Sequence, residues 1–367
     1  MRVLVAPDAF DGTLTAPAAA RAIAEGWLRR APDDQVTQAP MADGGTGFVD
    51  VLHTALGGEL QVVTVPGPHG APTPMTLLVH DDTVYVESSQ ACGHQVAGDG
   101  DPERASSRGV GEAVAAALAV GPARVVVGVG GCASNDGGAG LLSALGVTAD
   151  VPLDAGPLGL EGLTVVDATA ARAATEGVEL VVATDVTTVL LGMFGTTNVH
   201  GADRGLDEDA RQRVDRLLDG WVDALCGRTP AERRAADAPG SGAGGGIGLA
   251  LMQLGATRRS GIEVVADAVG LRALAAAHDV VVTGEGAYDF SSREGKVAHG
   301  VATVAGEAIR PCVVLAGRVL VGAREMRAMG VEAAYAVVDL VGEEAAVRDP
   351  AASLSRLATR VARTWSF

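Results

Sequence analysis

Residues 124–145 read RVVVGVGGCASNDGGAGLLSAL, an apolar run followed by a glycine-rich turn and then by helix-forming residues. This order is typical of a buried strand that leads through a tight turn into a helix. Such a turn presents backbone amides and the positive end of a helix at the carboxyl edge of a sheet, where phosphates and carboxylates bind. The turn also carries Asn135 and Asp136, a neutral donor and an acid. We therefore predict that chemistry occurs at this turn.

Further apolar runs of the same kind are spread along the chain, at residues 3–5, 180–182, 280–282, 312–315 and 335–338. They lack polar alternation, which indicates strands that helices cover on both faces. Segments with helical spacing of Ala, Leu and Arg lie between them, at residues 16–30, 111–119, 207–225 and 298–309. The alternation predicts an α/β fold with mainly parallel strands.

Residues 59–89 interrupt this pattern with three short strands separated by two turns, and residues 76–86 alternate with period two. Adjacent hairpins of this kind indicate an antiparallel sheet. A chain of 367 residues also exceeds the size of one hydrophobic core. We predict a discontinuous parallel-sheet domain formed by residues 1–58 and 275–367. Residues 59–274 are expected to be an inserted α/β domain with antiparallel strands, and small molecules favour the cleft of such a pair.

The composition argues against several classes of protein. Asp and Glu number 45 against 28 Lys and Arg, for a net charge of −17. No dominant basic face can form, so we expect neither nucleic acid nor a membrane surface as a partner. The four cysteines form no C-x-x-C pair and are expected to be reduced, mostly structural thiols. The first residues contain no signal-peptide core, so we expect a cytoplasmic protein.

Acidic residues follow several of the apolar runs, in company with glycine. They are Asp8, Asp43, Asp185, Glu285 and Asp289. Since ligands bind outside the carboxyl ends of parallel strands, these acids are expected to converge on one crevice. There they would hold magnesium or accept a hydroxyl proton. For any single one of them, a helix cap or an Asx turn is an equally good interpretation.

Other motifs are less specific. Residues 235–246 are rich in glycine and alanine and have a linker-like composition. Within them, residues 240–245 satisfy G-x-G-x-x-G, but the charged segment before them is not a strand, so a nicotinamide-binding fingerprint is disfavoured. Lys296 follows Gly295 without the rest of a Walker A loop, and either contacts a phosphate or is solvated. Arg108 either meets an acidic substrate or opens a helix. Cys132 in the glycine turn is interpreted as a packing residue.

Taken in order, these motifs resemble the signature segments of the type I glycerate kinase family over nearly the whole chain. The segments are APDAFDGTLTA, PMADGGTGFVD, ESSQACG, SSRGVGE, GVGGCASNDGGAG, ATDVTTVLLG, PGSGAGGGIG and TGEGAYDFSSREGK. The resemblance implies an ATP-dependent kinase of D-glycerate or of a related small hydroxy acid. It also implies a discontinuous Rossmann-like domain with a second α/β domain inserted in it, and phosphoryl transfer without a P-loop.

The resemblance also implies roles for individual residues. Asp185, Asp289 and Asp8 are candidates for base or metal contact, with Mg and ATP as cofactors. The other candidates for substrate or nucleotide binding are Asp43, Arg108, Gly130, Gly131, Asn135, Asp136, Glu285 and Lys296. Arg108 would contact the substrate carboxylate, and the glycine turn with Lys296 would hold phosphates. The resemblance does not decide whether the hydroxyl on the second or on the third carbon is phosphorylated. It also does not decide whether the chain forms a homodimer.

The chain departs from the family pattern at polar positions. Ala9 and Asp11 replace a serine and a lysine, and Ala287 and Ser291 replace an arginine and a glutamine. Further departures are Thr46, Cys132, Ser134, Thr188, Val189 and the segment ADRGL at 202–206 where the family has PQKGA. These departures motivate a second interpretation, a catalytically weakened paralogue that binds a metabolite or nucleotide in a regulatory role. A nicotinamide oxidoreductase is a third, resting on residues 240–245 alone.

Overall fold

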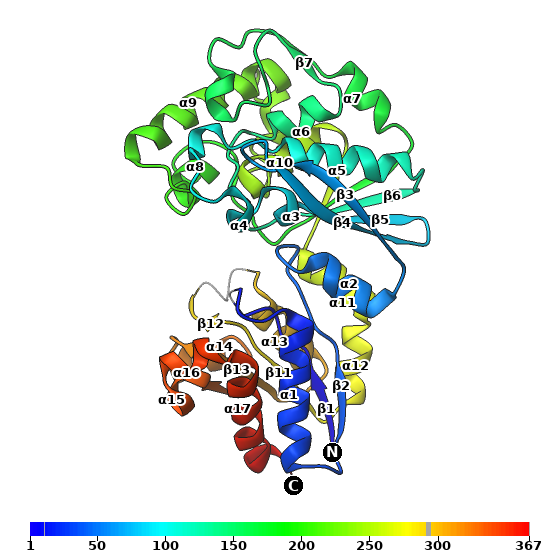
Figure 1. Cartoon of the computed structure of the whole chain (residues 1–367), viewed down its shortest axis with the longest axis vertical. Helices are drawn as coiled ribbons and strands as arrows, with labels where there is room; N and C mark the ends of the chain where they lie inside the picture. Colours follow the sequence, from blue (N-terminus) through cyan, green and yellow to red (C-terminus); the bar gives the residue numbers. More distant parts are fainter. Residues whose placement is uncertain (11, 291–294, 367) are drawn as a thin grey trace. The chain divides into compact units, whose positions relative to one another are not determined.

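The computed structural model describes residues 1–10, 12–290 and 295–366. Contacts divide the chain into two compact units (Figure 1). Unit 1 comprises Met1–Asp43, Asp50–Gly57 and Gly261–Phe367, and unit 2 comprises Gly44–Val49 and Gly58–Ser260. The chain passes from one to the other at Asp43 and Gly44, within helix α2 (Phe48–Leu56), at Gly57 and Gly58, and at Ser260 and Gly261. The domain boundaries expected from the sequence stay a prediction.

Unit 1 contains a five-stranded parallel sheet in the order β15-β13-β11-β1-β2. Its strands are β1 (Arg2–Val5), β2 (Gln35–Gln38), β11 (Val280–Thr283), β13 (Cys312–Ala316) and β15 (Ala333–Ala336). Val3 and Val5 face the same core cluster as Val280 and Val282, whereas the intervening Leu4 is buried outside that cluster. Both faces are therefore covered, as the unbroken apolar runs predicted.

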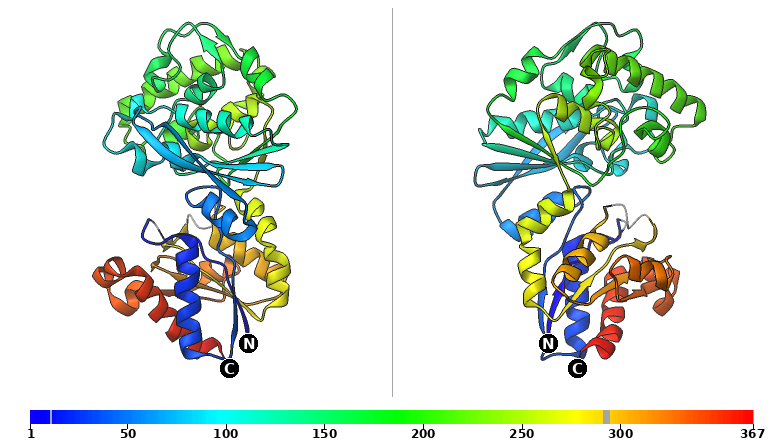
Figure 2. Two further views of the ribbon diagram at one scale, coloured as in Figure 1. Left: turned by 45° about the vertical axis from the view of Figure 1, so that its right-hand side comes forward. Right: turned by 180° about the vertical axis from the view of Figure 1, so that it is seen from behind.

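Helices cover the two faces of the unit 1 sheet. On one face α1 (Ala16–Arg30) and α17 (Pro350–Trp365) lie side by side, in blue and red in Figures 1 and 2. Gly26 permits this, because a Cβ there would lie 2.1 Å from the carbonyl oxygen of Ser355. Helix α12 (Leu271–Ala277) packs against β1, and α13 (Val297–Glu307) packs against β11 and β13. The remaining helices are α11 (Gly261–Val269), α14 (Ala323–Ala328), α15 (Val337–Val341) and α16 (Glu343–Arg348).

One strand of unit 1 is shorter than expected. The apolar run at 335–338 predicted a single strand, but β15 ends at Ala336 and α15 begins at Val337. The side chain of Val337 is buried in the cluster beneath α17, so tertiary packing overrides the strand preference of two successive valines here.

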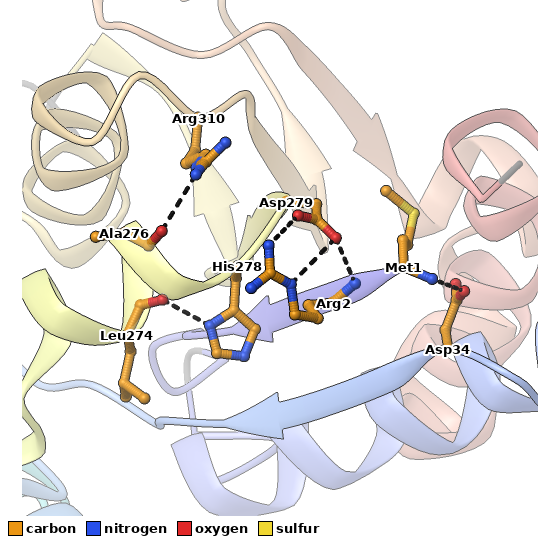
Figure 3. Close-up of polar contacts among 8 residues, drawn as sticks. All are labelled: Met1, Arg2, Asp34, Leu274, Ala276, His278, Asp279 and Arg310. Atoms are coloured by element: carbon orange, nitrogen blue, oxygen red, sulfur yellow. Dashed lines mark hydrogen bonds and ion pairs between the residues drawn. The ribbon is translucent and has the colours of Figure 1, made fainter.

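Polar contacts close the amino-terminal edge of this sheet (Figure 3). Arg2 donates from its backbone amide and its guanidinium to Asp279, at 2.8 and 2.6 Å, and so ties β1 to the start of β11. His278 bridges the carbonyl oxygen of Leu274 and the hydroxyl of Thr37. These contacts lie at the edge opposite the acids considered below, so their contribution is to stability.

Unit 2 contains a six-stranded mixed sheet in the order β10-β9-β6-β5-β4-β3. The strands are β3 (Glu59–Pro66), β4 (Pro72–His80), β5 (Thr83–Glu87), β6 (Arg124–Gly128), β9 (Glu179–Ala183) and β10 (Thr257–Arg259). The pairs β3-β4 and β4-β5 are antiparallel, and the pairs from β5 to β10 are parallel. The predicted α/β class, with a discontinuous parallel-sheet part and an inserted part that contains antiparallel strands, is confirmed.

One hydrophobic cluster forms the core of unit 2 and contains side chains from most of the helices of this unit. The helices of unit 2 are α3 (Ser88–Cys92), α4 (His94–Ala97), α5 (Arg108–Ala119), α6 (Ala139–Ala144), α7 (Thr169–Ala174), α8 (Thr196–His200), α9 (Glu208–Cys226) and α10 (Ile247–Gln253). Short pairs β7 (Thr148–Ala149) with β8 (Val166–Asp167), and β12 (Ala287–Tyr288) with β14 (Arg318–Val319) in unit 1, complete the strands. Among the described residues, none of the helices has the length and apolarity of a membrane span.

Candidate functional site

The glycine turn leaves the carboxyl end of β6, as the sequence predicted. The amide of Val129 donates to the carbonyl oxygen of Ala183 at 2.9 Å, and Thr184 Oγ1 donates to the carbonyl oxygen of Val129 at 2.7 Å. These bonds tie the ends of β6 and β9 together. Asp185, the second residue after β9, therefore emerges at the same edge of the unit 2 sheet as the turn, where ligands bind in parallel sheets.

A second glycine-rich segment, residues 240–248, packs against this turn backbone to backbone. The amide of Gly137 donates to the carbonyl oxygen of Gly245 at 2.9 Å. A Cβ on Gly245 would lie 2.0 Å from the carbonyl oxygen of Ser134, and one on Gly246 would lie 2.3 Å from the Cα of Gly137. The G-x-G-x-x-G pattern thus serves close packing, and a 3-10 turn at Ala243–Gly245, not a strand, precedes α10. Residues 235–246 had a linker-like composition, but residues 240–246 are buried.

Asp136 anchors the turn from inside. Its carboxylate accepts four hydrogen bonds, from the amide and hydroxyl of Ser107 at 2.8 and 2.9 Å and from the amides of Gly138 and Gly140 at 3.0 and 3.2 Å. A carboxylate has about four acceptor sites, so all are used within the fold. The side chain is fully buried, and burial raises its pKa although the four bonds oppose this. Asp136 therefore positions the starts of α5 and α6.

Two other predicted residues of unit 2 also have internal partners. Asn135 is fully buried and donates from Nδ2 to Thr197 Oγ1 at 2.9 Å, while its Oδ1 has no partner among the described atoms. Arg108 begins α5 and pairs with Glu112 at 2.8 Å and Asp154 at 2.6 Å. The guanidinium of Arg108 is thus already neutralised by two carboxylates.

A cavity of about 240 Å³ lies beside the turn within unit 2. Its lining includes Gly130, Gly131, Cys132, His94 and Arg204. Arg204 donates from Nε to the carbonyl oxygen of Cys132 at 3.1 Å and from Nη1 to Thr196. Among the described residues Arg204 has no ion pair, and its Nη2 makes no hydrogen bond.

The electrostatics of this cavity favour an anion. Burial lowers the pKa of Arg204, but a guanidinium remains charged at any physiological pH. Burial and then the charge of Arg204 lower the pKa of His94, and the charge of Asp203 opposes them. The carboxylate of Asp203 also lines the cavity and its charge acts on Arg204, but among the described residues no ion pair joins the two. A half-buried cation without an ion-pair partner is costly until an anion meets it. The cavity therefore fits a carboxylate or a phosphate.

In unit 1, four of the predicted residues interact at the carboxyl edge of the parallel sheet. Asp8 follows β1, and its amide donates to the carbonyl oxygen of Gly284 at 2.8 Å. Burial and then the charge of Asp43 raise the pKa of Asp8 well above its usual range, and Glu285 adds to this. The amide of Ala9 and the charge of Lys296 oppose the shift. Asp8, Asp43, Glu285 and Lys296 thus form one electrostatic group.

The described part of unit 1 holds no ready-made metal site, since in that part no three His, Cys, Asp or Glu side chains group to hold an ion. The crowding of Asp8, Asp43 and Glu285 would nevertheless be relieved by a cation. Magnesium usually needs only one or two carboxylates when phosphates supply its other ligands. The acids present therefore fit a magnesium ion that arrives with a nucleotide.

An apolar cavity of about 290 Å³ lies in unit 1, lined in part by Phe10, Ala287, Val338, Ala346 and Leu354. Asp289 follows β12 directly after the pair Ala287–Tyr288. Arg318 lines the same cavity as Ala287, the position of a family arginine, and pairs with Glu343 at 3.2 Å. The departures at Asp11 and Ser291 lie outside the described residues.

Sequence reasoning missed two residues of unit 2. Arg204 stands where the family pattern has a lysine, so retention of a cation in an otherwise divergent segment was the available signal. Glu87 is buried and accepts from the amides of Gly47 and Val49 at 3.0 and 3.1 Å, and also from Ser89. It holds the segment that leads into α2. No spacing in the sequence indicates that contact.

Comparison with known proteins agrees with these features. The sequence model of the glycerate kinase family matches residues 3–366. A glycerate 2-kinase of Escherichia coli is 32% identical over 99% of this chain and 98% of its own length, and a glycerate kinase of Bacillus subtilis is 33% identical over 92% and 90%. An uncharacterised protein of Mycobacterium bovis is 37% identical over 99% and 91%.

The fold is similar as well. The crystal structure of a protein assigned as glycerate kinase 2 from Salmonella typhimurium LT2 aligns with a TM-score of 0.81 at 32% identity, covering 99% of this chain and 98% of that one. Family match, full-length relatives and shared architecture all span both units. The chain therefore belongs to the glycerate kinase family and is a kinase.

Proposed function

We propose that the chain transfers the γ-phosphoryl group of ATP to a hydroxyl of D-glycerate, giving a phosphoglycerate and ADP. The hydroxyl oxygen forms a bond to phosphorus while the bond to the β-γ bridging oxygen breaks, and a carboxylate accepts the hydroxyl proton. Catalysis of such a transfer consists mainly of positioning and charge neutralisation. The candidates for the carboxylate are Asp8, Asp185 and Asp289.

The observation that supports this proposal in addition to family membership is the position of Arg204. It lines the cavity beside the glycine turn and has no ion pair among the described residues. A three-carbon acid carries one carboxylate, and the planar guanidinium suits it because two parallel N–H bonds can form. Gly130 and Gly131 line the same cavity, and their backbone amides would add neutral donors. We assign the glycerate carboxylate to Arg204 in place of Arg108, whose charge is neutralised by Glu112 and Asp154.

The nucleotide is assigned to unit 1. The apolar cavity lined by Val338, Ala346 and Leu354 suits the adenine base. Asp43 and Glu285 would hold the magnesium ion, which when bound neutralises phosphate charge, and Lys296 at the start of α13 would contact a phosphate. Replacing Ala346 with Trp is expected to raise the KM for ATP and leave that for glycerate unchanged. Glu344→Trp, exposed on the same helix, is the control.

The direct test is release of ADP from ATP in the presence of magnesium and D-glycerate. Asp8→Asn, Asp185→Asn and Asp289→Asn are each measured against Asp339→Asn, an exposed acid of unit 1. Loss of a general base lowers kcat about 100-fold or more, so at least one of the three should do so. If all three variants kept the kcat of the unmodified chain, the general base would not be Asp8, Asp185 or Asp289. Absence of ADP release with every small hydroxy acid would refute the proposal.

The position of the product phosphate is a further part of the proposal. The Escherichia coli relative is named a glycerate 2-kinase, which favours the hydroxyl of the second carbon here. Phosphorus NMR of the product separates the two isomers. The regulatory paralogue is the less favoured alternative, and it would require binding of ATP or glycerate without turnover. A cytoplasmic location and a homodimer remain predictions.

A further inference from the structure

Two free cysteines meet in unit 2 although they are far apart in sequence. Gly93 and Cys132 form an isolated antiparallel bridge, and the amide of Ala133 donates to the carbonyl oxygen of Cys92 at 2.7 Å. Both thiols contact Ser88: Cys132 Sγ lies 3.2 Å from its Oγ, and Cys92 Sγ donates to its carbonyl oxygen at 3.3 Å. Cys132 is paired with Gly93, the neighbour of Cys92, and the shared contact with Ser88 brings the two thiols to the same place, as a disulfide between them requires.

The two thiols differ in reactivity and access. Cys132 lines the cavity that contains Arg204, whereas Cys92 is buried and is not among the residues that line it. Interaction with Cys92, then Ser88 and the charge of Arg204, lowers the pKa of Cys132, although burial opposes this. Interaction with Cys132 and burial raise the pKa of Cys92. Burial raises the pKa of Cys226 to about 11 and that of Cys312 to about 12. Cys132 is thus the thiol most ready to react, because the thiolate is the reactive form.

We propose that Cys132 and Cys92 form a reversible disulfide when the chain meets a peroxide, and that this disulfide inhibits the kinase. The Cys132 thiolate attacks one peroxide oxygen, so that an S–O bond forms, the O–O bond breaks and the leaving hydroxide becomes water. The resulting sulfenic acid is then attacked by Cys92, so that the S–S bond forms and a second water leaves. In total two thiols are oxidised and one hydrogen peroxide is reduced to two waters.

Inhibition would follow from the bond between Arg204 and this turn. Arg204 Nε donates to the carbonyl oxygen of Cys132, the residue whose side chain would be redirected toward Cys92. A shift of that carbonyl moves the guanidinium that we assign to the glycerate carboxylate. This half of the inference rests on the proposed function. Formation of the disulfide does not.

The test uses the full chain, treated with hydrogen peroxide, then unfolded in urea in the presence of N-ethylmaleimide so that every remaining thiol is alkylated, and finally digested and measured by mass spectrometry. The expected result is a joined pair of peptides carrying Cys92 and Cys132, separated by dithiothreitol, with Cys226 and Cys312 alkylated. In Cys92→Ser, Cys132 should stop at sulfenic acid and be trapped by dimedone. In Cys132→Ser, which has the serine of the family pattern, neither product should form.

Activity provides the second measurement. Peroxide should lower the rate of ADP release by the unmodified chain at least tenfold, and dithiothreitol should restore it. The rate of the Cys132→Ser variant after peroxide treatment should equal that of the same variant without treatment. Four alkylated thiols in the treated, unmodified chain would overturn the disulfide. A disulfide that forms without any change in the rate would overturn the inhibition alone. A chain that forms the disulfide but shows no turnover before treatment would contradict the proposed function, not the disulfide.

Discussion

Arg204 Nε donates to the carbonyl oxygen of Cys132 over 3.1 Å, so this half-buried cation of unit 2 is held by the backbone of the glycine turn and not by an acid. A backbone carbonyl fixes the direction of the guanidinium without neutralising it. The residual charge is directed at the cavity that Cys132 and Gly131 also line. This arrangement keeps the charge of Arg204 available for a ligand.

Replacement of Arg204 with Met is expected to raise the KM for D-glycerate about 10- to 100-fold. A charge-assisted hydrogen bond contributes about 1.5–3 kcal/mol, and each 1.4 kcal/mol is about tenfold. Arg204→Lys should recover part of the loss, because it keeps the charge without the planar pair of donors. Initial rates at varied glycerate and at varied ATP give both KM values, and that for ATP should not change.

The matched control is Arg213→Met, which removes a surface arginine of unit 2 that pairs with Glu103 at 2.6 Å. An exposed pair of this kind contributes about 0–1 kcal/mol, so both KM values should stay as they are. If Arg204→Met raised the KM for ATP and not that for glycerate, the cavity would hold a phosphate instead.

Replacement of Asp136 with Asn should destabilise unit 2 by about 2 kcal/mol. An amide accepts fewer hydrogen bonds than a carboxylate, so donors among Ser107, Gly138 and Gly140 lose their partner, at about 1–3 kcal/mol each. Relief of the buried charge offsets part of this loss. Urea unfolding followed by the fluorescence of Trp221 measures it, since that indole is fully buried and donates to the carbonyl oxygen of Gly137.

Asp154→Asn, an exposed partner of Arg108, is the control for the Asp136 variant and should cost less than about 1 kcal/mol. The folded Asp136→Asn variant should keep the KM for glycerate of the unmodified chain. A raised KM with unchanged stability would instead place this carboxylate in ligand binding, as the family resemblance suggested.

Much of the fold could be predicted, because a strand that is buried on both faces of its sheet has an unbroken run of apolar residues in the sequence. The valine runs of β6, β9 and β11 are unbroken by polar residues, and each lies in a parallel sheet. The segment at 235–246 was misinterpreted, since small residues serve flexible linkers and close backbone packing equally well. Only the opposing chain, the turn around Gly137, distinguishes the two cases.

The site was predictable in its residue types but not in its contacts. The glycine turn and the acids after the strands follow from local order, and unit 1 brings Asp8, Asp43 and Glu285 into one electrostatic group. The contact of Arg204 with the turn joins segments with no shared spacing, as does the meeting of Cys92 with Cys132. Such contacts depend on tertiary packing, which a single sequence does not display.

Gly245→Ala is expected to lower the free energy of unfolding of unit 2 by about 3 kcal/mol or more. Its φ of +67° is unfavourable for alanine, and the new Cβ would lie 2.0 Å from the carbonyl oxygen of Ser134. Gly121→Ala is the control, because φ is +77° there and nothing lies within 4 Å of the new Cβ. It should cost only about 1 kcal/mol. Equal losses in urea unfolding would show that backbone conformation, not close packing, requires glycine at 245.

Asp279 should make the stability of unit 1 depend on acid pH. The bond from Arg2 lowers the pKa of Asp279 from its usual 3.8 to about 2 in the folded chain. A lowered carboxyl pKa contributes stability that is fully present above the unfolded value and is lost as pH falls from about 4 toward 2. The difference in unfolding free energy between the unmodified chain and Asp279→Asn should therefore shrink over that window, and added salt should reduce it at higher pH. Urea unfolding followed by the buried Trp27 measures it, with Asp339→Asn, an exposed acid of unit 1, as the control. If the difference in unfolding free energy stays constant from about pH 5 to 2.5, then Asp279 contributes to stability through packing and not through its ion pair with Arg2.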